Sequence, residues 1–369
     1  MKDINDLFLT LSCIEEIFAS KAFIKKLYFS FNNFFEIFTS DFSDFNGKIT
    51  QEEREKIQTT RKELKKIKLS EIKKTLELKK IKFLAYCEKD YPAKLKDISD
   101  SPFCLFYRGN LELLKKSKTT AIVGTRAATK YGINVSNDIA SLLAKQGIVI
   151  ISGLASGIDT SAHAGAITSG KTIAVLGTGV DIIFPVSNEK LSYEILDKDG
   201  LIVSEYPPGA PGLPWNFPQR NRIISALSDA VVIIEGDVQS GAMITARFAI
   251  KQGKPLFALP GPIDSSVSNG PNILIKSGVA ELLVSVNDIL EKIGEEKQIK
   301  LELKNNEKPI DKLNEREKKI YKMLSGDSKG FDILLQETEL SLQELTRELS
   351  ILELKGLVEK TPDGGYVSI

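Results

Sequence analysis

Between residues 120 and 259 the chain repeats one pattern: a short apolar run, a glycine or small polar residue, and then a helical segment. The apolar runs span residues 120–123, 148–151, 172–176, 201–203, 230–234 and 255–259. Continuous apolar runs of this length are typical of strands that are buried on both faces of a parallel sheet. We therefore predict a doubly wound α/β domain, in which helices cover both faces of a mostly parallel sheet.

The first part of the chain has a different pattern. Ten of the 18 phenylalanines precede residue 46, and apolar residues recur there at helical spacing, which predicts a small helical domain. Residues 61–82 then hold ten Lys or Arg against three Glu. We favour a solvated helix face for this basic segment; the alternative is a helix that approaches a phosphate backbone.

The last part of the chain begins after a charged segment, residues 291–309, which is too polar to bury and is predicted to be a linker. Amphipathic segments at 315–324, 331–337 and 341–354 predict three helices. Apolar pairs on either side of the turn sequence Pro362-Asp363-Gly364-Gly365 predict a hairpin, so the whole resembles a winged helix. The predicted domains are 1–82, 83–290 and 311–369, with a linker at 291–310.

Charge narrows the classes of function. Lys and Arg number 50 against 49 Asp and Glu, so the net charge is +1 and any site for a polyanion must be local. The first ten residues lack the apolar core of a signal peptide, and no run approaches the ~18 apolar residues of a membrane span. We expect a cytoplasmic protein without membrane insertion. Three scattered cysteines and the single His163 predict neither a disulfide framework nor a metal site.

Glycine-rich loops follow the predicted strands, at the sheet edge where ligands bind in open α/β folds. Glycine lets the backbone approach an anion, and a neighbouring hydroxyl adds a hydrogen-bond donor. Several such loops at one edge predict a phosphate-binding surface. Its candidate residues are Gly124, Thr125, Arg126, Ser152, Gly153, Gly177, Ser240 and Gly241.

A second group of candidates lies in one segment ahead of the fifth predicted strand. Arg220, Asn221 and Arg222 are expected in an exposed loop, where the arginines would bind phosphates. Trp215 and Phe217 are candidates for stacking on unpaired bases, although they would equally serve to pack the loop.

Several kinds of chemistry are not supported. No GxGxxG precedes an acid at dinucleotide-binding spacing, and no GxxxxGK[ST] is present, so neither a nicotinamide cofactor nor P-loop ATP hydrolysis is predicted. His163 opens a helix of small residues and has no GxSxG nucleophile to serve. We predict a packed, hydrogen-bonded histidine, no catalytic residue and no cofactor.

Taken in order, the motifs of residues 91–283 resemble the DNA-processing protein A family, DprA or Smf. They are AIVGTRAATKYG, SGLASGIDTSAHAGAI, GTGVDIIFP, SEYPPG, FPQRNRIISALSDAVVIIEG, SGAMITARFAIKQGKPLFALPG and GPNILIKSG. The resemblance implies an extended Rossmann-like domain that binds single-stranded DNA, forms a homodimer, protects incoming DNA and helps load the recombinase RecA during natural transformation. It also implies that the first domain is SAM-like.

The resemblance assigns DNA contacts to Arg126, to the loop at 152–153 and to residues 220–222. After Phe184 and Pro185 many relatives carry a basic residue where this chain has Val186, and Lys190 is the candidate to supply that charge.

Two other functions fit parts of the pattern. The first is a nucleoside-monophosphate phosphoribohydrolase of the lysine-decarboxylase-like group, but the catalytic glutamate of its PGGxGTxxE motif has no counterpart after Glu235. The second is a winged-helix transcription factor with an α/β sensor domain. Its recognition helix at 341–354 would carry Glu344, Glu348 and Glu353 against Arg347 alone, which disfavours contact with phosphates.

Overall fold

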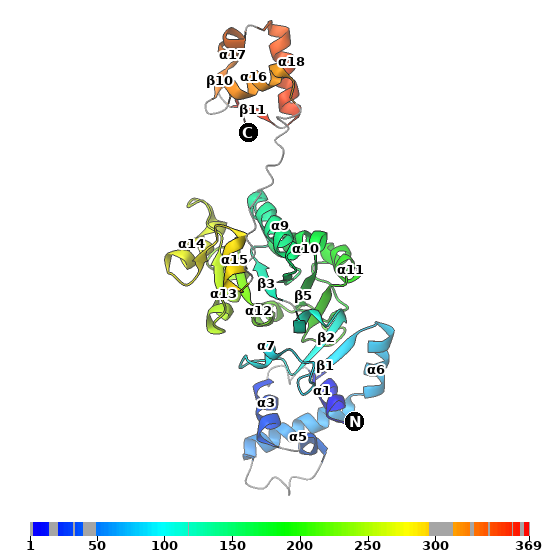
Figure 1. Ribbon diagram of the computed structural model, residues 1–369. Helices are drawn as coiled ribbons and strands as arrows, with labels where there is room; N and C mark the ends of the chain where they lie inside the picture. Colours follow the sequence, from blue (N-terminus) through cyan, green and yellow to red (C-terminus); the bar gives the residue numbers. More distant parts are fainter. Residues whose placement is uncertain are drawn as a thin grey trace. The chain divides into compact units, whose positions relative to one another are not determined.

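The computed structural model describes residues 3–14, 21–31, 34–39, 49–116, 118–294, 313–324, 328–338, 340–355, 357–361 and 365–368. The chain divides into two compact units, Met1–Ile299 and Lys300–Ile369, and each is described by itself (Figure 1). Most of the predicted linker lies outside the described residues. Its first residues belong to the end of helix α15 (Val286–Lys292) and the turn after it.

A nine-stranded sheet forms the centre of the first unit, in the order β1-β2-β6-β5-β4-β3-β7-β8-β9. All pairings among β3 to β9 are parallel, which confirms the predicted fold class. The six predicted runs correspond to β3 (Thr119–Val123), β4 (Val149–Ser152), β5 (Thr172–Leu176), β6 (Leu201–Ser204), β7 (Ala230–Ile233) and β8 (Leu256–Ala258).

Three further strands were not predicted. The hairpin β1 (Lys82–Ala85) and β2 (Cys104–Gly109) extends the sheet with antiparallel pairing, and β2 joins β6. At the opposite edge, the two-residue strand β9 (Glu281–Leu282) pairs only with β8 among the strands of the sheet. Strand β9 has only two residues, both exposed, and β1 only four, whereas β2 carries a buried apolar run, residues 104–107, that was overlooked in the sequence.

The order in which the chain adds strands to the sheet reverses at β3. From β3 the chain builds outward through β4, β5 and β6, and it then returns to place β7 on the other side of β3. Ligands of open α/β sheets bind in the crevice beyond the strand ends at such a switch point. The loops after β3 and β7 are therefore the ones that define a site.

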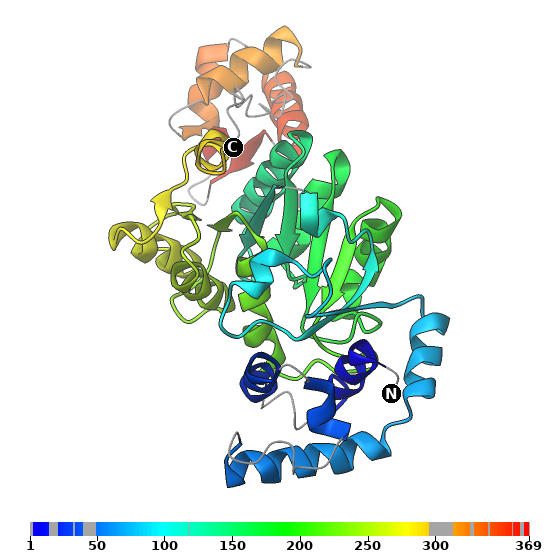
Figure 2. The ribbon, with the colours of Figure 1, turned by 60° about the horizontal axis from the view of Figure 1, so that its bottom comes forward.

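Helices cover both faces of this sheet (Figure 2). Strand residues point alternately to the two faces: Ile122 packs with α9 (Lys130–Lys145), α10 (Ile158–Ser169) and α15, whereas Ala121 and Val123 lie in the opposite cluster. That cluster holds α12 (Asn216–Leu227) and α13 (Gly241–Lys251). The remaining helices of the domain are α7 (Ala93–Lys96), α8 (Leu113–Lys116), α11 (Glu189–Asp197) and α14 (Asn269–Lys276).

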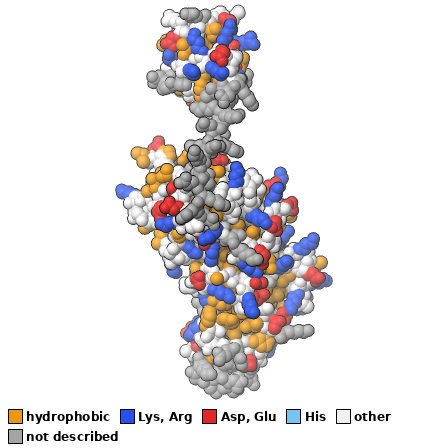
Figure 3. Space-filling view, in the orientation of Figure 1, with side chains coloured by type: hydrophobic (Ala, Val, Ile, Leu, Met, Phe, Trp, Pro, Cys, Tyr) orange, Lys and Arg blue, Asp and Glu red, His pale blue; other side chains and the backbone are white. Residues whose placement is uncertain are grey.

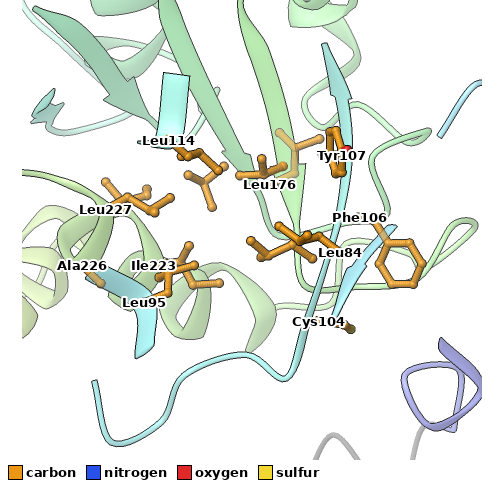
Figure 4. Packing of buried hydrophobic residues seen from close by; sticks show 14 of the residues in the cluster. Leu84, Leu95, Cys104, Phe106, Tyr107, Leu114, Leu176, Ile223, Ala226 and Leu227 are labelled. Atoms are coloured by element: carbon orange, nitrogen blue, oxygen red, sulfur yellow. The ribbon is translucent and has the colours of Figure 1, made fainter. Parts of the chain in front are cut away.

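The antiparallel extension packs onto α12. Leu84 of β1, Leu95 of α7 and Leu114 of α8 share an apolar cluster with Ile223 and Leu227 of α12 (Figure 4). Burial of such side chains contributes about 1.5–3 kcal/mol each. The extension therefore holds α12, which carries the predicted arginines, against the sheet.

The first part of the unit is helical, with α1 (Ile4–Leu11), α3 (Lys21–Ser30), α4 (Phe34–Thr39), α5 (Gln51–Lys66) and α6 (Leu69–Leu78). The ring centroid of Phe8 lies 5.3 Å from that of Phe34 and 6.1 Å from that of Phe103, so the helical core continues into the chain before β2. Helix α6 ends beside the sheet, where Lys79 pairs with Asp181 at 2.5 Å.

The second unit has the predicted winged-helix elements. Helices α16 (Glu315–Met323), α17 (Phe331–Thr338) and α18 (Leu342–Leu354) pack around Ile320, Leu334 and Leu345, which are fully buried. A small sheet of β10 (Lys329–Gly330), β11 (Val358–Lys360) and β12 (Gly365–Ser368) completes it, in the order β10-β12-β11. The predicted hairpin is confirmed; its tip at 362–364 lies outside the described residues.

Across the described residues, no helix combines the length and apolarity needed to cross a membrane. Lysines and arginines are interspersed with acids on the face that Figure 3 shows. This distribution agrees with the near-neutral net charge, so local groups must supply any affinity for a polyanion.

Candidate functional site

A cavity of about 610 Å³ lies at the switch point, beyond the carboxyl ends of β3 and β7. It brings together residues that are far apart in the sequence. Those predicted as anion ligands are Gly124, Thr125, Arg126, Arg220, Asn221, Ser240 and Gly241, and the stacking candidate Phe217 joins them. We call this cavity the switch-point pocket.

Three helix amino termini contribute to the wall of the switch-point pocket. Asp159 belongs to the first turn of α10, Phe217 to that of α12, and Gly241 begins α13. None of these three helices has a side-chain hydrogen bond to its cap. At the starts of α10 and α12, Ile158 N, Thr160 N and Asn216 N already donate to backbone carbonyls, and Pro218 has no N–H. The start of α13, where Gly241 and Ala242 line the pocket, is therefore the terminus best placed to present N–H donors and positive potential to an anion.

The hydroxyl of Ser240 is a second sign of a ligand. Its Oγ is buried and has no hydrogen-bond partner among the described residues, although Ser240 precedes α13 and lines the pocket. Buried hydroxyls nearly always have a partner. The hydroxyl lies against Gly236 in this structure, so it would donate to a phosphate oxygen at the start of α13 after rotation about χ1.

Arg220 supplies a buried positive charge. Its Nη1 donates to Gly153 O at 2.7 Å and to Val175 O, and its Nε donates to Asn221 Oδ1 at 3.1 Å. Burial lowers the pKa of Arg220 to about 10, while Asp159 acts to raise it, so the guanidinium stays protonated at pH 7. The expectation that Arg220 lies in an exposed loop is wrong, because it lies inside α12 and only 4% of its surface is exposed.

The opening of the pocket combines a cation with aromatic rings. The exposed guanidinium of Arg126 lies 5.5 Å from the ring centroid of Phe217, and that ring lies 5.3 Å from Phe184. Nearly half of the Phe184 surface is exposed. Rings and a guanidinium arranged in this way can stack on flat, electron-rich groups such as nucleobases.

The glycines of the predicted loops have two distinct roles. A side chain at Gly153 would meet the Arg220 guanidinium at 2.5 Å, and one at Gly177 would meet Phe217 at 2.8 Å. These glycines make room for protein groups. Gly241 instead faces open space, so it is the one of these three at which a ligand can approach the backbone.

Arg222 does not line the pocket. It is 4% exposed, its Nη2 donates to Glu205 Oε2 at 2.7 Å, and its Nε lies 3.3 Å from Asp100 Oδ2. The expectation of an exposed loop arginine is wrong here too. Residues two apart on a helix point in different directions, so Arg220 and Arg222 cannot both face the same ligand.

Five other predicted residues lie outside the switch-point pocket, among them Gly153 and Gly177, which make room for Arg220 and Phe217. Ser152 is fully buried and donates to Ile122 O at 2.7 Å. Lys190 is on the exposed surface of α11, 3.6 Å from Glu194. Trp215 is 60% exposed and lines a neighbouring cavity.

The two carboxylates nearest the site are held by hydrogen bonds. Glu235 accepts from the backbone N and the Oγ1 of Thr129 at 2.9 and 2.5 Å, at the start of α9. Asp159 accepts from Gly153 N at 3.0 Å; burial raises its pKa, and Arg220 partly counters this. Both acids therefore stabilise loops around the site.

His163 is buried, as expected, and its hydrogen bonds identify its tautomer. Thr172 Oγ1 donates to Ile150 O, so His163 Nδ1 must donate to Thr172 Oγ1, 2.7 Å away. Nε2 is then unprotonated and has no partner in the described part of the chain. Burial, followed by the charge of Arg220, lowers the pKa of His163 to about 3, which keeps it neutral.

Sequence reasoning missed two parts of this region. Phe184 was named only as part of a motif and not as a candidate for stacking. Its position before Pro185, in the segment after a glycine loop, could have indicated a residue near the pocket. The ion pairs of Arg222 were also missed, since Glu205 and Asp100 precede it by many residues. Among the described residues, no cluster of three or more His, Cys, Asp or Glu could hold a metal ion.

The fold and the pocket define a class: a Rossmann-like protein with a pocket lined by arginines and glycine loops at its switch point, which also carries a winged helix. Residues 82–294 match the family described as DNA recombination-mediator protein A, and residues 304–364 match the DprA winged helix domain. The chain belongs to this family, DprA/Smf, which confirms the resemblance drawn from its motifs.

Individual relatives agree with this assignment. The chain is 42% identical to DNA processing protein DprA of Streptococcus pneumoniae over 215 residues, which are 58% of this chain and 75% of that protein. It is 44% identical to protein Smf of Escherichia coli over 204 residues, 55% of this chain and 54% of that one.

Two solved structures are also similar. The X-ray structure of DprA from S. pneumoniae has a TM-score of 0.61 and 34% identity, and the match covers 78% of this chain and 99% of that one. DNA processing protein A from Helicobacter pylori, described for its single-stranded-DNA binding mode, has a TM-score of 0.53 and 33% identity, with 59% and 97% coverage.

Proposed function

We propose that this protein is a non-enzymatic recombination mediator that binds single-stranded DNA in the switch-point pocket and needs no cofactor. The observation that carries the proposal is the meeting of Arg126, Arg220, the start of α13 and the Ser240 hydroxyl, which has no partner among the described residues, around one cavity. Each of these groups favours an anion. A phosphodiester is the anion that a member of this family would meet.

The aromatic rings at the opening favour a single strand over a duplex. Phe184 and Phe217 can stack only on a base whose face is accessible. In a duplex the bases are stacked on one another and only their edges face the grooves. The similar protein from H. pylori was described as a single-stranded-DNA binder, which supports the same choice.

Hydrolysis of nucleotides is disfavoured by the geometry of the acids. A phosphoribohydrolase needs a carboxylate that is free to act on the ribose. Glu235 instead holds the first turn of α9 through Thr129, and Asp159 holds the Gly153 backbone beside Arg220. The surroundings of both acids support a binding role for the pocket.

A homodimer formed by the α/β domain is part of the proposal. The edge strand β9 and the adjoining α14 expose apolar residues, including Ile273, Val279, Leu282 and Val284. Exposed edge strands with apolar side chains readily pair with another copy. Two pockets on one strand would increase affinity through effective concentration.

The delivery of RecA to the bound strand and the protection of incoming DNA complete the proposal, and membership of the recombination-mediator family supports them. The winged helix is less suited to DNA. Its helix α18 carries Glu344 and Glu353 toward solvent, against Arg347. We propose that this unit is structural or binds protein.

The test is a titration of the full chain with labelled oligo(dT) at rising salt concentration, in competition with duplex DNA and with AMP. We expect preference for the single strand and an affinity that falls with salt, with a slope of about −0.7 per phosphate contacted. Equal affinity for duplex, or no dependence on salt, would contradict the proposal. Release of free base from AMP would support the hydrolase instead.

A further inference from the structure

A second cavity, of about 510 Å³, lies next to the switch-point pocket. The two cavities share the segment 211–217. Gly212, Pro214 and Phe217 line the switch-point pocket, whereas Pro211, Leu213, Trp215 and Asn216 line the second one, so the residues alternate from 211 to 215. The segment is therefore a wall that the two cavities share.

The lining of the second cavity is aromatic, apolar and uncharged. Trp215 lies at its margin with 60% of its surface exposed, and Tyr206 and several prolines form the interior. Of the described residues that line it, none is charged at neutral pH. Such a surface does not bind a phosphate, but it suits a flat, uncharged ring.

The position of Trp215 leaves its indole free to contact a ligand. The residue is the N-cap of α12, where an indole can accept no hydrogen bond from the first turn, and most of its surface is exposed. Gln219 is exposed one turn further along α12, on the same side of the helix, and also lines the cavity. Its amide can donate to, or accept from, the edge of a ring placed on the indole.

We propose that the second cavity is a nucleobase subsite, in which Trp215 stacks on one base of the strand whose phosphate occupies the switch-point pocket. The proposal rests on the single-stranded-DNA binding proposed above and extends it from one pocket to two. The occupant is assigned from continuity: a strand that crosses the wall at 211–217 passes directly from the charged pocket to the uncharged one. Stacking tolerates any base, so little sequence preference is expected.

The protein contains its own reporter for this site, because Trp215 is the only tryptophan in the chain. Stacking of a base on an indole quenches its fluorescence. In the full chain, oligo(dT) should quench the emission as it binds, whereas inorganic phosphate, which has no ring to stack on the indole, should leave it nearly unchanged. Oligonucleotide binding, followed independently by a label on the DNA, without any change in emission would overturn the subsite.

Substitution gives the second readout. Trp215→Leu keeps an apolar side chain and should weaken oligonucleotide binding roughly 5- to 150-fold, the range expected for one lost stacking contact, while Trp215→Phe should lose less. Tyr193→Leu is the matched control, because it removes an aromatic ring of similar exposure on α11 that lines neither cavity. Equal affinities for Trp215→Leu and the natural chain would overturn the proposal.

The same experiment separates failure of the subsite from failure of the function. If no oligonucleotide binds at any salt concentration, the proposed function fails and the subsite fails with it. If oligonucleotides bind with a clear salt dependence but ignore Trp215, only the subsite fails. Quenching by a proline-rich peptide, with none by DNA, would assign the cavity to a protein partner instead.

Discussion

Arg222 donates to Glu205 at 2.7 Å, and both side chains are almost completely buried between α12 and the carboxyl end of β6. Arg220, two residues earlier on the same helix, lines the switch-point pocket. One short motif thus contains a buried arginine that borders the pocket while it bonds to the Gly153 and Val175 carbonyls, and a buried arginine that pairs with Glu205 away from the pocket. Substitutions at the two positions should have different consequences.

We expect Arg222→Gln to destabilise the protein by about 3–5 kcal/mol, because it removes the cation that pairs with the buried carboxylate of Glu205. Denaturant unfolding of the full chain measures this. Arg126→Ala is the contrasting variant: the side chain is exposed, so the free energy of unfolding should change by less than about 0.5 kcal/mol while DNA affinity falls. The assignment is wrong if Arg222→Gln unfolds normally and loses only DNA binding.

Ser240→Ala should separate binding from stability most cleanly. The hydroxyl makes no hydrogen bond in the described structure and does not cap α13, so its removal should leave the melting temperature unchanged or slightly raised. A hydrogen bond to a charged phosphate contributes about 1.5–3 kcal/mol, so affinity for oligo(dT) should fall roughly tenfold or more. Ser192→Ala on α11 is the control. Unchanged affinity would remove Ser240 from the site.

His163 should make stability depend on pH. Its pKa is lowered to about 3 in the fold, against ~6.5 in the unfolded chain, so the unfolded state binds the proton first as the pH falls. Above pH 6.5 both states are neutral and the stability is complete. Below pH 6.5 the free energy of unfolding falls, and the loss reaches about 2 kcal/mol at pH 5. His163→Leu should flatten the stability curve between pH 7 and 5. Identical curves for both proteins would contradict the buried, neutral assignment.

The proposed dimer can be tested at the β9 edge. Val284 is 76% exposed beside this strand, and Val284→Asp should favour the monomer because it places a charge in an apolar contact. Light scattering at micromolar concentration measures the mass. Leu78→Asp, at an equally exposed apolar residue on α6, should leave the mass unchanged. A dimer that persists in Val284→Asp but not in Leu78→Asp would show that the interface lies on the amino-terminal helices instead of at β9.

The parallel sheet could be predicted because its strands are buried on both faces. Each strand therefore appears in the sequence as an uninterrupted apolar run. The hairpin β1–β2 could not, because its partner β6 is a hundred residues away and supplies much of its stability. Sequence periodicity describes local faces, whereas such pairing depends on tertiary contacts.

The pocket could be predicted in part for the same reason. Loops after parallel strands must meet at one edge, so Thr125 and Gly241 were found from topology alone. The sequence does not tell whether each of these side chains points into the pocket or into the core. Arg222 and Ser152 have the residue types of ligands, but helix phase and strand alternation turn them inward.

The central position of β3 has a consequence for the order in which the protein opens. This strand is paired on both sides and leads directly into the loop of Thr125 and Arg126, while β9 and β1 lie at the two ends of the sheet. Amide hydrogen exchange should therefore be slowest in β3 and fastest in β9 and β1. The edges can open and close repeatedly while the binding loop keeps its shape.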